Sequence, residues 1–230
     1  MVGCFWNTNL KTEIKLVTLT REQTRDLLVK ALRFLEEKAS YLNELDRAMG
    51  DGDHGTTIAR GVKSAVHDLQ SAVPLNANEV FVIAGKAMMK SMGGASGVLY
   101  GVFFRGAQEV PGTMGLDART LQDFFNSGLK NLQQKTKAQA GDKTMLDALL
   151  PALQVIQQAK TDSLAEALQS AAAAAELGAQ ATVGMMPKFG RAKTLGERAM
   201  SGRDPGATSM AFLFQGLAEA AEGISNDRSS

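Results

Sequence analysis

The chain has 230 residues, of which 44% are hydrophobic and 21% charged, and its formal net charge is +1. This length suffices for one large domain with a substantial core, and the charge balance argues against a disordered or nucleic-acid-coating protein. Aromatic residues make up only 6%, and only 5 prolines occur, which favours helices over sheets. Cys4 is the single cysteine, and no apolar run approaches the roughly 20 residues of a membrane span. We therefore expect a cytoplasmic protein that binds neither nucleic acid nor a membrane.

The chain divides into an N-terminal extension, residues 1–19, without periodicity, and one domain over residues 20–225. Thr20 with Gln23 has the capping-box pattern that begins a helix, here running to about Ala48. Apolar spacing predicts seven further helices, at about 56–70, 76–89, 98–104, 117–135, 146–156, 164–182 and 207–224. No segment has a convincing strand pattern, so we predict an all-α fold.

Three carboxylates, Asp46, Asp51 and Asp53, fall within eight residues and alternate with glycines in the first interhelical turn. A glycine-rich turn lets such carboxylates face one point, and their oxygens suit a hard divalent ion such as Mg2+. Asp46 also lies in the last turn of a helix, where the dipole disfavours an anion unless a cation compensates it. An EF-hand fails, because Val62 stands where that loop needs a glutamate. A turn without any site is the alternative interpretation.

The helix that follows this turn should direct its first free N–H groups at the same place, which suits an anion. Three later connections are similarly polar. They are the glycine-rich loop 91–97, the turn 141–145, and the loop 186–206 with basic residues at 188, 191, 193, 198 and 203. The first lacks the Gly-Lys-Ser/Thr of a Walker motif. Close helix packing and a solvated basic loop remain alternatives for the first and the last.

Short connections predict antiparallel neighbours, hence an eight-helix up-and-down bundle or barrel. Successive connections in that topology alternate between the two ends. The four polar connections follow helices one, three, five and seven, so all four should lie at one end. Carboxylates for a metal beside amides and basic residues for phosphate predict a metal–nucleotide site there.

Five ordered motifs, LDRAMGDGDHG, SMGGASG, GDKTM, GRAKTLGER and DPGATS, resemble the L subunit of bacterial dihydroxyacetone kinase over about residues 20–222. The resemblance implies an eight-helix antiparallel barrel that binds ADP (or ATP) through two Mg2+ ions at one end. It implies Asp46, Asp51 and Asp53 as magnesium ligands, and it makes Arg191 and His54 candidates for catalysis. The implied nucleotide contacts are His54, Gly55, Thr56, Thr57, Gly94, Ala95, Ser96, Thr136, Met145, Arg191, Asp204, Pro205 and Gly206. Thr57 stands where many members have Asn, and Thr136 where a Gly is expected.

The implied activity is phosphoryl transfer to dihydroxyacetone or a related short ketose, held by a separate K subunit. In the phosphotransferase-linked form, which we favour, the ADP is a retained cofactor that an M subunit rephosphorylates. The resemblance also suggests a homodimer. Alternatives are an ATP-dependent ketose kinase subunit and a non-catalytic module that keeps ADP–Mg2+ to dock a partner. A histidine phosphocarrier using His54 is less favoured, because three carboxylates surround that residue.

Overall fold

The computed structural model describes residues 18–227, so Cys4 and the extension up to residue 17 lie outside the described residues. The α-helices are α1 Arg21–Glu37, α2 Ala39–Arg47, α3 His54–Ser71, α4 Ala77–Ser91, α5 Gly94–Arg105, α6 Ala118–Gln133, α7 Leu146–Gln158, α8 Leu164–Ala181 and α9 Pro205–Asp227. The short elements are the 3-10 helices η1 Gly106–Glu109 and η2 Arg191–Met200 and the strands β1 Leu19–Thr20 and β2 Gly115–Leu116.

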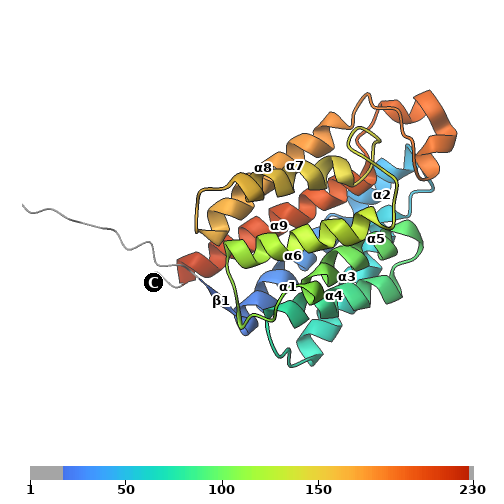
Figure 1. The fold of residues 1–230 in the computed structure, drawn as a ribbon. Coiled ribbons are helices and arrows are strands. Elements are labelled where there is room, and N and C mark those ends of the chain that lie inside the picture. Colours follow the sequence, from blue (N-terminus) through green and yellow to red (C-terminus); the bar gives the residue numbers. More distant parts are fainter. Residues whose placement is uncertain (1–17, 228–230) are drawn as a thin grey trace, which may run out of the picture.

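The helices lie side by side (Figure 1), and each packs against the next along the chain so that together they form a closed ring. The ring closes because α9 packs against α1 as well as against α8. With α1 and α2 counted as one bent unit, the described chain has eight α-helical segments around this ring. The structure therefore confirms the all-α prediction.

The first predicted helix is broken at Lys38, which separates α1 from α2. The Lys38 backbone leaves the helical region, with φ −86° and ψ 3°, and its ammonium group lies 4.5 Å from the centre of the Phe34 ring. The bend lets α2 pack against α3, where the backbone of Gly55 approaches the Ala39 carbonyl. No Gly or Pro marks this break, so local sequence signals did not reveal it.

The prediction of no strand is wrong for two short segments among the described residues. Strands β1 and β2 pair in antiparallel register, Leu19 opposite Leu116 and Thr20 opposite Gly115. The Leu19 side chain is only 3% exposed, so this residue belongs to the packed domain and not to the extension. Two-residue strands are too short to show the period-two alternation that identifies a strand.

Three helix starts and one predicted loop also differ. Helix α3 begins at His54, α5 at Gly94 and α9 at Pro205, each two to four residues earlier than expected. The first turn of α5 was not predicted because the glycine and serine of the loop 91–97 have low helix propensity. The start of α9 was predicted too late because proline, here Pro205, is tolerated in the first turn of a helix. The connection expected as a polar loop contains η2, which is kinked at Gly196, φ +56°.

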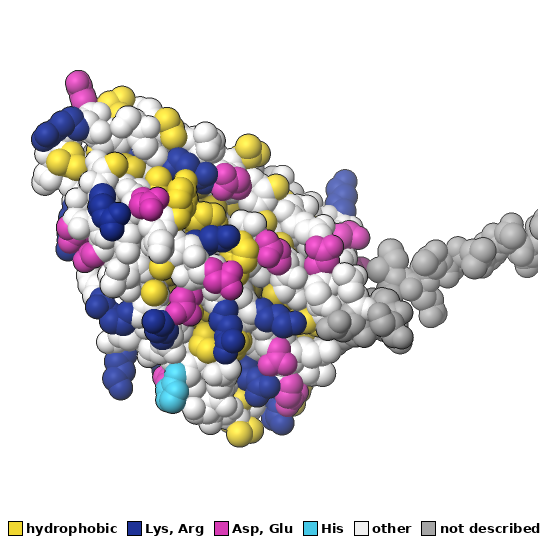
Figure 2. All heavy atoms as spheres, turned by 180° about the vertical axis from the view of Figure 1, so that it is seen from behind, with side chains coloured by type: hydrophobic (Ala, Val, Ile, Leu, Met, Phe, Trp, Pro, Cys, Tyr) yellow, Lys and Arg dark blue, Asp and Glu magenta, His cyan; other side chains and the backbone are white. Residues whose placement is uncertain are grey.

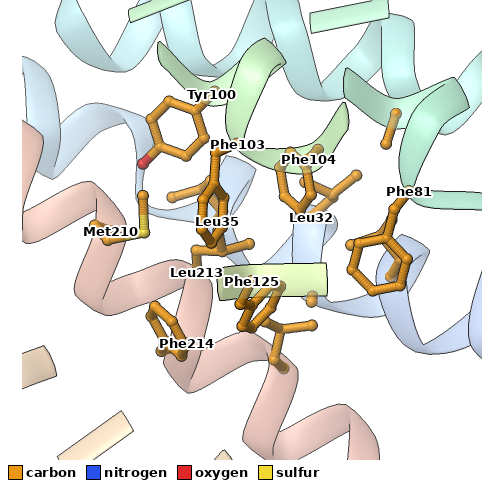
Figure 3. Packing of buried hydrophobic residues seen from close by; sticks show 14 of the residues in the cluster. Leu32, Leu35, Phe81, Tyr100, Phe103, Phe104, Phe125, Met210, Leu213 and Phe214 are labelled. Atoms are coloured by element: carbon orange, nitrogen blue, oxygen red, sulfur yellow. The ribbon is translucent and has the colours of Figure 1, made fainter. Parts of the chain in front are cut away.

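The core lies inside the ring and is built from aromatic and aliphatic side chains (Figure 3). Phe81 meets Phe124 edge to face with ring centres 5.3 Å apart, and Phe125 meets Phe214 in the same way at 5.7 Å. A side chain of this kind contributes roughly 1.5–3 kcal/mol when fully buried. These contacts join α4, α6 and α9 across the ring, which fixes where the connections at its ends lie.

The surface carries both signs of charge. On the face shown in Figure 2, Lys and Arg side chains are interspersed with Asp and Glu. In the described part of the chain, no helix is both long enough and apolar enough to cross a membrane.

Candidate functional site

Contacts between distant segments bring all four polar connections to one end of the ring, named here the site end. Arg191, in the connection between α8 and α9, pairs with Asp51 of the turn between α2 and α3. Lys143, between α6 and α7, donates a 2.6 Å hydrogen bond to the Gly202 carbonyl. Arg60 of α3 donates one of 2.8 Å to the Ser91 carbonyl, just before α5. The alternation of connections therefore places them as the sequence pattern predicts.

The three aspartates of the first turn form one cluster. One carboxylate oxygen from each of Asp46, Asp51 and Asp53 lies within 4.8 Å of the others. Asp46 is half-buried and the other two are exposed. Arg191 pairs directly with Asp51, and its guanidinium lies 3.8 Å from Asp53. Three carboxylates are thus partly neutralised by one arginine, and the oxygens present a donor set that fits Mg2+.

The expectation of free N–H groups at the start of α3 is wrong. Asp46 Oδ2 accepts hydrogen bonds from the backbone N–H of Asp53 at 2.9 Å and of His54 at 3.2 Å. The N–H of Thr56 donates to the Asn43 side chain at 3.0 Å. The start of α3 therefore compensates the Asp46 charge, so its place at the end of α2 does not by itself require a cation.

The first turn of α5 is the open helix start at the site end. Its N-cap residue, Gly93, makes no side-chain capping bond, and Gly94, φ +65°, and Ala95 are exposed, with Ser96 half-buried. A Cβ at Gly94 would meet no atom within 4 Å, so space beside the backbone is open. Helix-start N–H groups without a cap attract anions. Of these two helix starts, α5 therefore has the one that is open to an anion.

His54 is tied to α9 and α5 through a hydroxyl. Its Nε2 lies 3.0 Å from Ser209 Oγ, which also accepts a 2.9 Å bond from the Tyr100 hydroxyl. Although the residue keeps some surface exposed, burial of the ring lowers the pKa of His54 to about 4, and the nearby Asp46 carboxylate opposes this only in part. His54 is therefore a neutral imidazole near pH 7.

A buried charge cluster lies beneath the Asp204-Pro205-Gly206 turn. Lys143, 1% exposed, donates 2.6 Å hydrogen bonds to the carbonyls of Thr182 and Gly202. Burial lowers the pKa of Lys143, whereas the nearby carboxylates of Asp204 and Asp147 raise it. Burial raises the pKa of Asp204 to about 7, and the hydrogen bond from the Ala207 N–H opposes this. The cluster joins three segments that surround the site.

Two of the five basic residues in the last connection serve other partners. Lys188 pairs with Asp142 at 2.7 Å, which lowers the pKa of that carboxyl, and Arg203 makes two 2.8 Å hydrogen bonds to Glu176. Arg191 alone of the five is paired with the aspartate cluster. Of the five basic residues that were expected to suit a polyphosphate, Arg191 is therefore the best placed.

Of the remaining predicted nucleotide contacts, some meet residues from other segments and others make local hydrogen bonds. A Cβ at Gly206 would lie 3.5 Å from the Met145 backbone N, so the turn before α9 meets the turn before α7. Thr57 is buried in α3, and its hydroxyl lies 3.5 Å from an Arg60 nitrogen. Thr136 lies after α6, where its hydroxyl accepts a hydrogen bond from the Ala138 N–H and its own N–H donates to the Leu132 carbonyl, so these hydrogen bonds are local.

Sequence reasoning missed four residues that shape the site, namely Asn43, Tyr100, Lys143 and Ser209. Lys143 and Ser209 lie inside the motifs GDKTM and DPGATS, and Tyr100 follows the glycine-rich loop. Lys143 is also the non-glycine residue with positive φ, 59°, in the described chain. Asn43 carried no local signal, because its partner is thirteen residues away.

Comparison with known proteins places the chain in a family. Residues 48–219 match the DAK2 domain family. The chain is 36% identical over 209 residues to the PEP-dependent dihydroxyacetone kinase, ADP-binding subunit DhaL, of Escherichia coli (strain K12), which covers 90% of this chain and 100% of that subunit. It is also 36% identical over 197 residues to Triokinase/FMN cyclase of Rattus norvegicus, of which it spans 33%. Among solved structures, the dihydroxyacetone kinase from C. freundii in complex with AMP-PNP and Mg2+ aligns with a TM-score of 0.66 and 27% identity, over 95% of this chain and 37% of that one.

Proposed function

Because the chain belongs to the DAK2 domain family of dihydroxyacetone kinase subunits, we propose that it holds ADP with Mg2+ and relays a phosphoryl group to dihydroxyacetone or a related ketose. The ketose would be held by a K subunit, and the phosphoryl donor would be an M subunit of the phosphotransferase system. The observation that carries the proposal is the meeting of Asp46, Asp51 and Asp53 with Arg191 from the opposite half of the chain.

The aspartate cluster fits a magnesium site by its donor chemistry. Three carboxylates with oxygens within 4.8 Å of one another supply the hard oxygen ligands that Mg2+ prefers. We propose that Asp46, Asp51 and Asp53 hold two Mg2+ ions together with the nucleotide phosphates. When bound, the ions would neutralise phosphate charge. Asp46 is held in place beforehand, because two backbone N–H groups at the start of α3 fix its carboxylate.

The nucleotide would lie across the site end. The open first turn of α5, with Gly94, Ala95 and Ser96, is suited to phosphate oxygens. We assign Met145 and the Asp204-Pro205-Gly206 turn, which lie against each other, to the nucleotide as well. We assign further contacts to His54, Gly55, Thr56, Thr57 and Thr136. Of these, Thr136 has the weakest support, because its contacts are local.

Arg191 is the candidate for phosphate neutralisation by the protein. Its planar guanidinium can hold two phosphate oxygens at once, and it already lies beside the carboxylates that would bind the metal. We propose that Arg191 anchors the nucleotide and, to a smaller degree, stabilises charge on the transferring phosphoryl group. His54 is unsuited to carrying the phosphoryl group at Nε2, because that atom is hydrogen-bonded to the buried Ser209.

Nucleotide content tests the proposal. The purified chain should release ADP on acid treatment, and Asp51→Asn should lose most of it, together with the stabilisation that a bound ligand provides. Asp162→Asn, an exposed aspartate just before α8, is the matched control and should keep its ADP. Full ADP occupancy in Asp51→Asn without added Mg2+ would refute the metal assignment. ADP retention without any phosphoryl transfer would instead favour the docking module.

A second candidate is a kinase subunit that exchanges nucleotide and acts on another ketose. This candidate is retained because the chain is as similar to Triokinase/FMN cyclase of Rattus norvegicus as to the Escherichia coli subunit, with 36% identity to each. With a K subunit alone, we expect no sustained turnover of ATP and dihydroxyacetone, and we expect activity once the M subunit and phosphotransferase proteins are added. Sustained turnover with ATP and the K subunit alone would establish the second candidate.

Two further expectations belong to the same proposal. A cytoplasmic location agrees with the lack of a membrane-spanning helix among the described residues. A homodimer is the expected assembly, and light scattering of the purified chain measures it directly.

A further inference from the structure

A chain of three polar groups runs from the site into the core. His54 Nε2 lies 3.0 Å from Ser209 Oγ, and the Tyr100 hydroxyl donates to the same oxygen at 2.9 Å. The Tyr100 side chain is 1% exposed and Ser209 is fully buried. Figure 3 shows the Tyr100 hydroxyl directed toward the helix that carries Met210, the neighbour of Ser209. Helices α3, α5 and α9 therefore meet through one hydroxyl oxygen.

The protons at this oxygen can be counted. Ser209 Oγ has one proton, and it donates that proton to the Gly206 carbonyl at 2.9 Å. The oxygen then has two acceptor positions left. Tyr100 fills one of them, and burial, which raises the pKa of its phenol, keeps that group a donor. With the Ser209 proton on the Gly206 carbonyl, the remaining position takes an N–H, which assigns the ring proton of His54 to Nε2.

We infer that Tyr100 and Ser209 are positioning residues that fix His54 as the Nε2–H tautomer. Tyr100 holds the Ser209 oxygen from the α5 side, and the Gly206 carbonyl, in the first turn of α9, takes its proton. The orientation of the His54 ring thus depends on two helices that contribute to the predicted nucleotide site. The second ring nitrogen, Nδ1, keeps its lone pair and is the free acceptor of the ring.

The consequence for the site rests on the proposed function. A His54 locked in this form can accept a hydrogen bond at Nδ1 but has no proton there to donate to a phosphate oxygen. It also keeps Nε2 out of reach of a phosphoryl group. His54 would therefore select for a hydrogen-bond donor in the bound complex, and it would leave the phosphate charge to Arg191 and the metal.

The ring tautomer can be read directly by long-range 1H–15N correlation spectra of the histidine side chains. The sequence contains only two histidines, so His67→Gln assigns both signals. We expect the nucleotide-free wild type to show His54 as a single Nε2–H tautomer. Ser209→Ala removes the acceptor of the Nε2 proton and should convert it to a mixture of tautomers, and Tyr100→Phe, which leaves the Ser209 hydroxyl in place, should do so to a smaller degree. Tyr41→Phe, at the other tyrosine of the chain, which is exposed and packs against Phe212, is the matched control and should leave it unchanged.

Two results would overturn the inference. One is an Nδ1–H tautomer in the wild type, and the other is a single Nε2–H tautomer that survives in both variants. Should Tyr100→Phe fail to fold, Ser209→Ala decides alone. As a second readout, each variant should retain ADP about fivefold less tightly, the scale of one lost hydrogen bond. A wild type without ADP would refute the proposed function and leave the tautomer result intact, because the spectra are recorded without nucleotide.

Discussion

Replacing Lys143 by methionine should destabilise the whole site end. The methionine side chain matches the length of lysine but removes the ammonium, so the carbonyls of Thr182 and Gly202 each lose a 2.6 Å hydrogen bond. The Thr182 carbonyl keeps a hydrogen bond from the Met185 N–H, but the Gly202 carbonyl is left unpaired, which costs about 1–3 kcal/mol, and Asp204 and Asp147 lose the positive charge beside them. Relief of the desolvated ammonium offsets part of this. We expect a net loss of about 3–5 kcal/mol in the free energy of unfolding, as for a broken buried ion pair.

Chemical denaturation at pH 7 measures this loss, and thermal unfolding should show the midpoint falling by about 6–20 °C for a chain of this size. Lys86→Met, on the exposed face of α4, is the matched control and should stay within about 0.5 kcal/mol of the wild type. A loss for Lys143→Met no larger than that control would refute the reasoning, because it would mean that the Gly202 carbonyl and the two carboxylates are as well solvated by water as by the ammonium.

Three further predictions follow from single contacts. Gly55→Ala should lower the free energy of unfolding by about 1–3 kcal/mol, because its Cβ would stand 1.8 Å from the Ala39 carbonyl oxygen. The control Gly223→Ala, whose Cβ would meet nothing within 4 Å, should be neutral or stabilising by up to about 1 kcal/mol. Urea unfolding compares the two variants, and equal effects would contradict the close approach of α2 and α3. Because the pKa of Asp204 is raised to about 7, this residue contributes stability that is complete below about pH 4 and is lost as the pH rises toward 7. Between pH 5 and 7.5, without nucleotide, the free energy of unfolding of the wild type should therefore fall by about 2–3 kcal/mol relative to Asp204→Asn. Parallel pH profiles of the two proteins would refute this. Arg191→Lys should mainly weaken ADP retention and lower the transfer rate per bound nucleotide only modestly, measured as ADP content and single-turnover transfer on one preparation; full retention with a 10²–10³-fold slower rate would make Arg191 chiefly catalytic.

The parts that sequence reasoning found are those encoded within a few residues. Asp46, Asp51 and Asp53 lie in one turn, so their grouping follows from the glycines between them, and the all-α ring follows from helical spacing. The site end followed from counting connections. Arg191 was one of five basic residues predicted at the site end, and only the family motif singled it out, because its partner Asp51 lies in the opposite half of the chain.

The parts that were missed depend on tertiary contacts. No local rule places Tyr100 of α5 against Ser209 of α9, or makes the Lys143 ammonium bridge the carbonyls of Thr182 and Gly202. The start of α3 was expected to be open because its capping partners, Asp46 and Asn43, belong to the preceding helix. The bend at Lys38, which brings those partners into place, has no sequence mark of its own.

The seam between α1 and α9 has a consequence for folding order. Every other neighbouring pair in the ring joins helices close in sequence, and such local contacts form early, whereas this pair closes nearly the whole chain into a loop. Gln23 and Ile224 line the same surface groove, so the two ends of the domain lie together. A circular permutant joined across them and opened at residues 159–163 would keep all four connections of the site end. The last pair of helices to associate would then be a different one, and α9 would pack at the site with α1 already joined to it through the new linker.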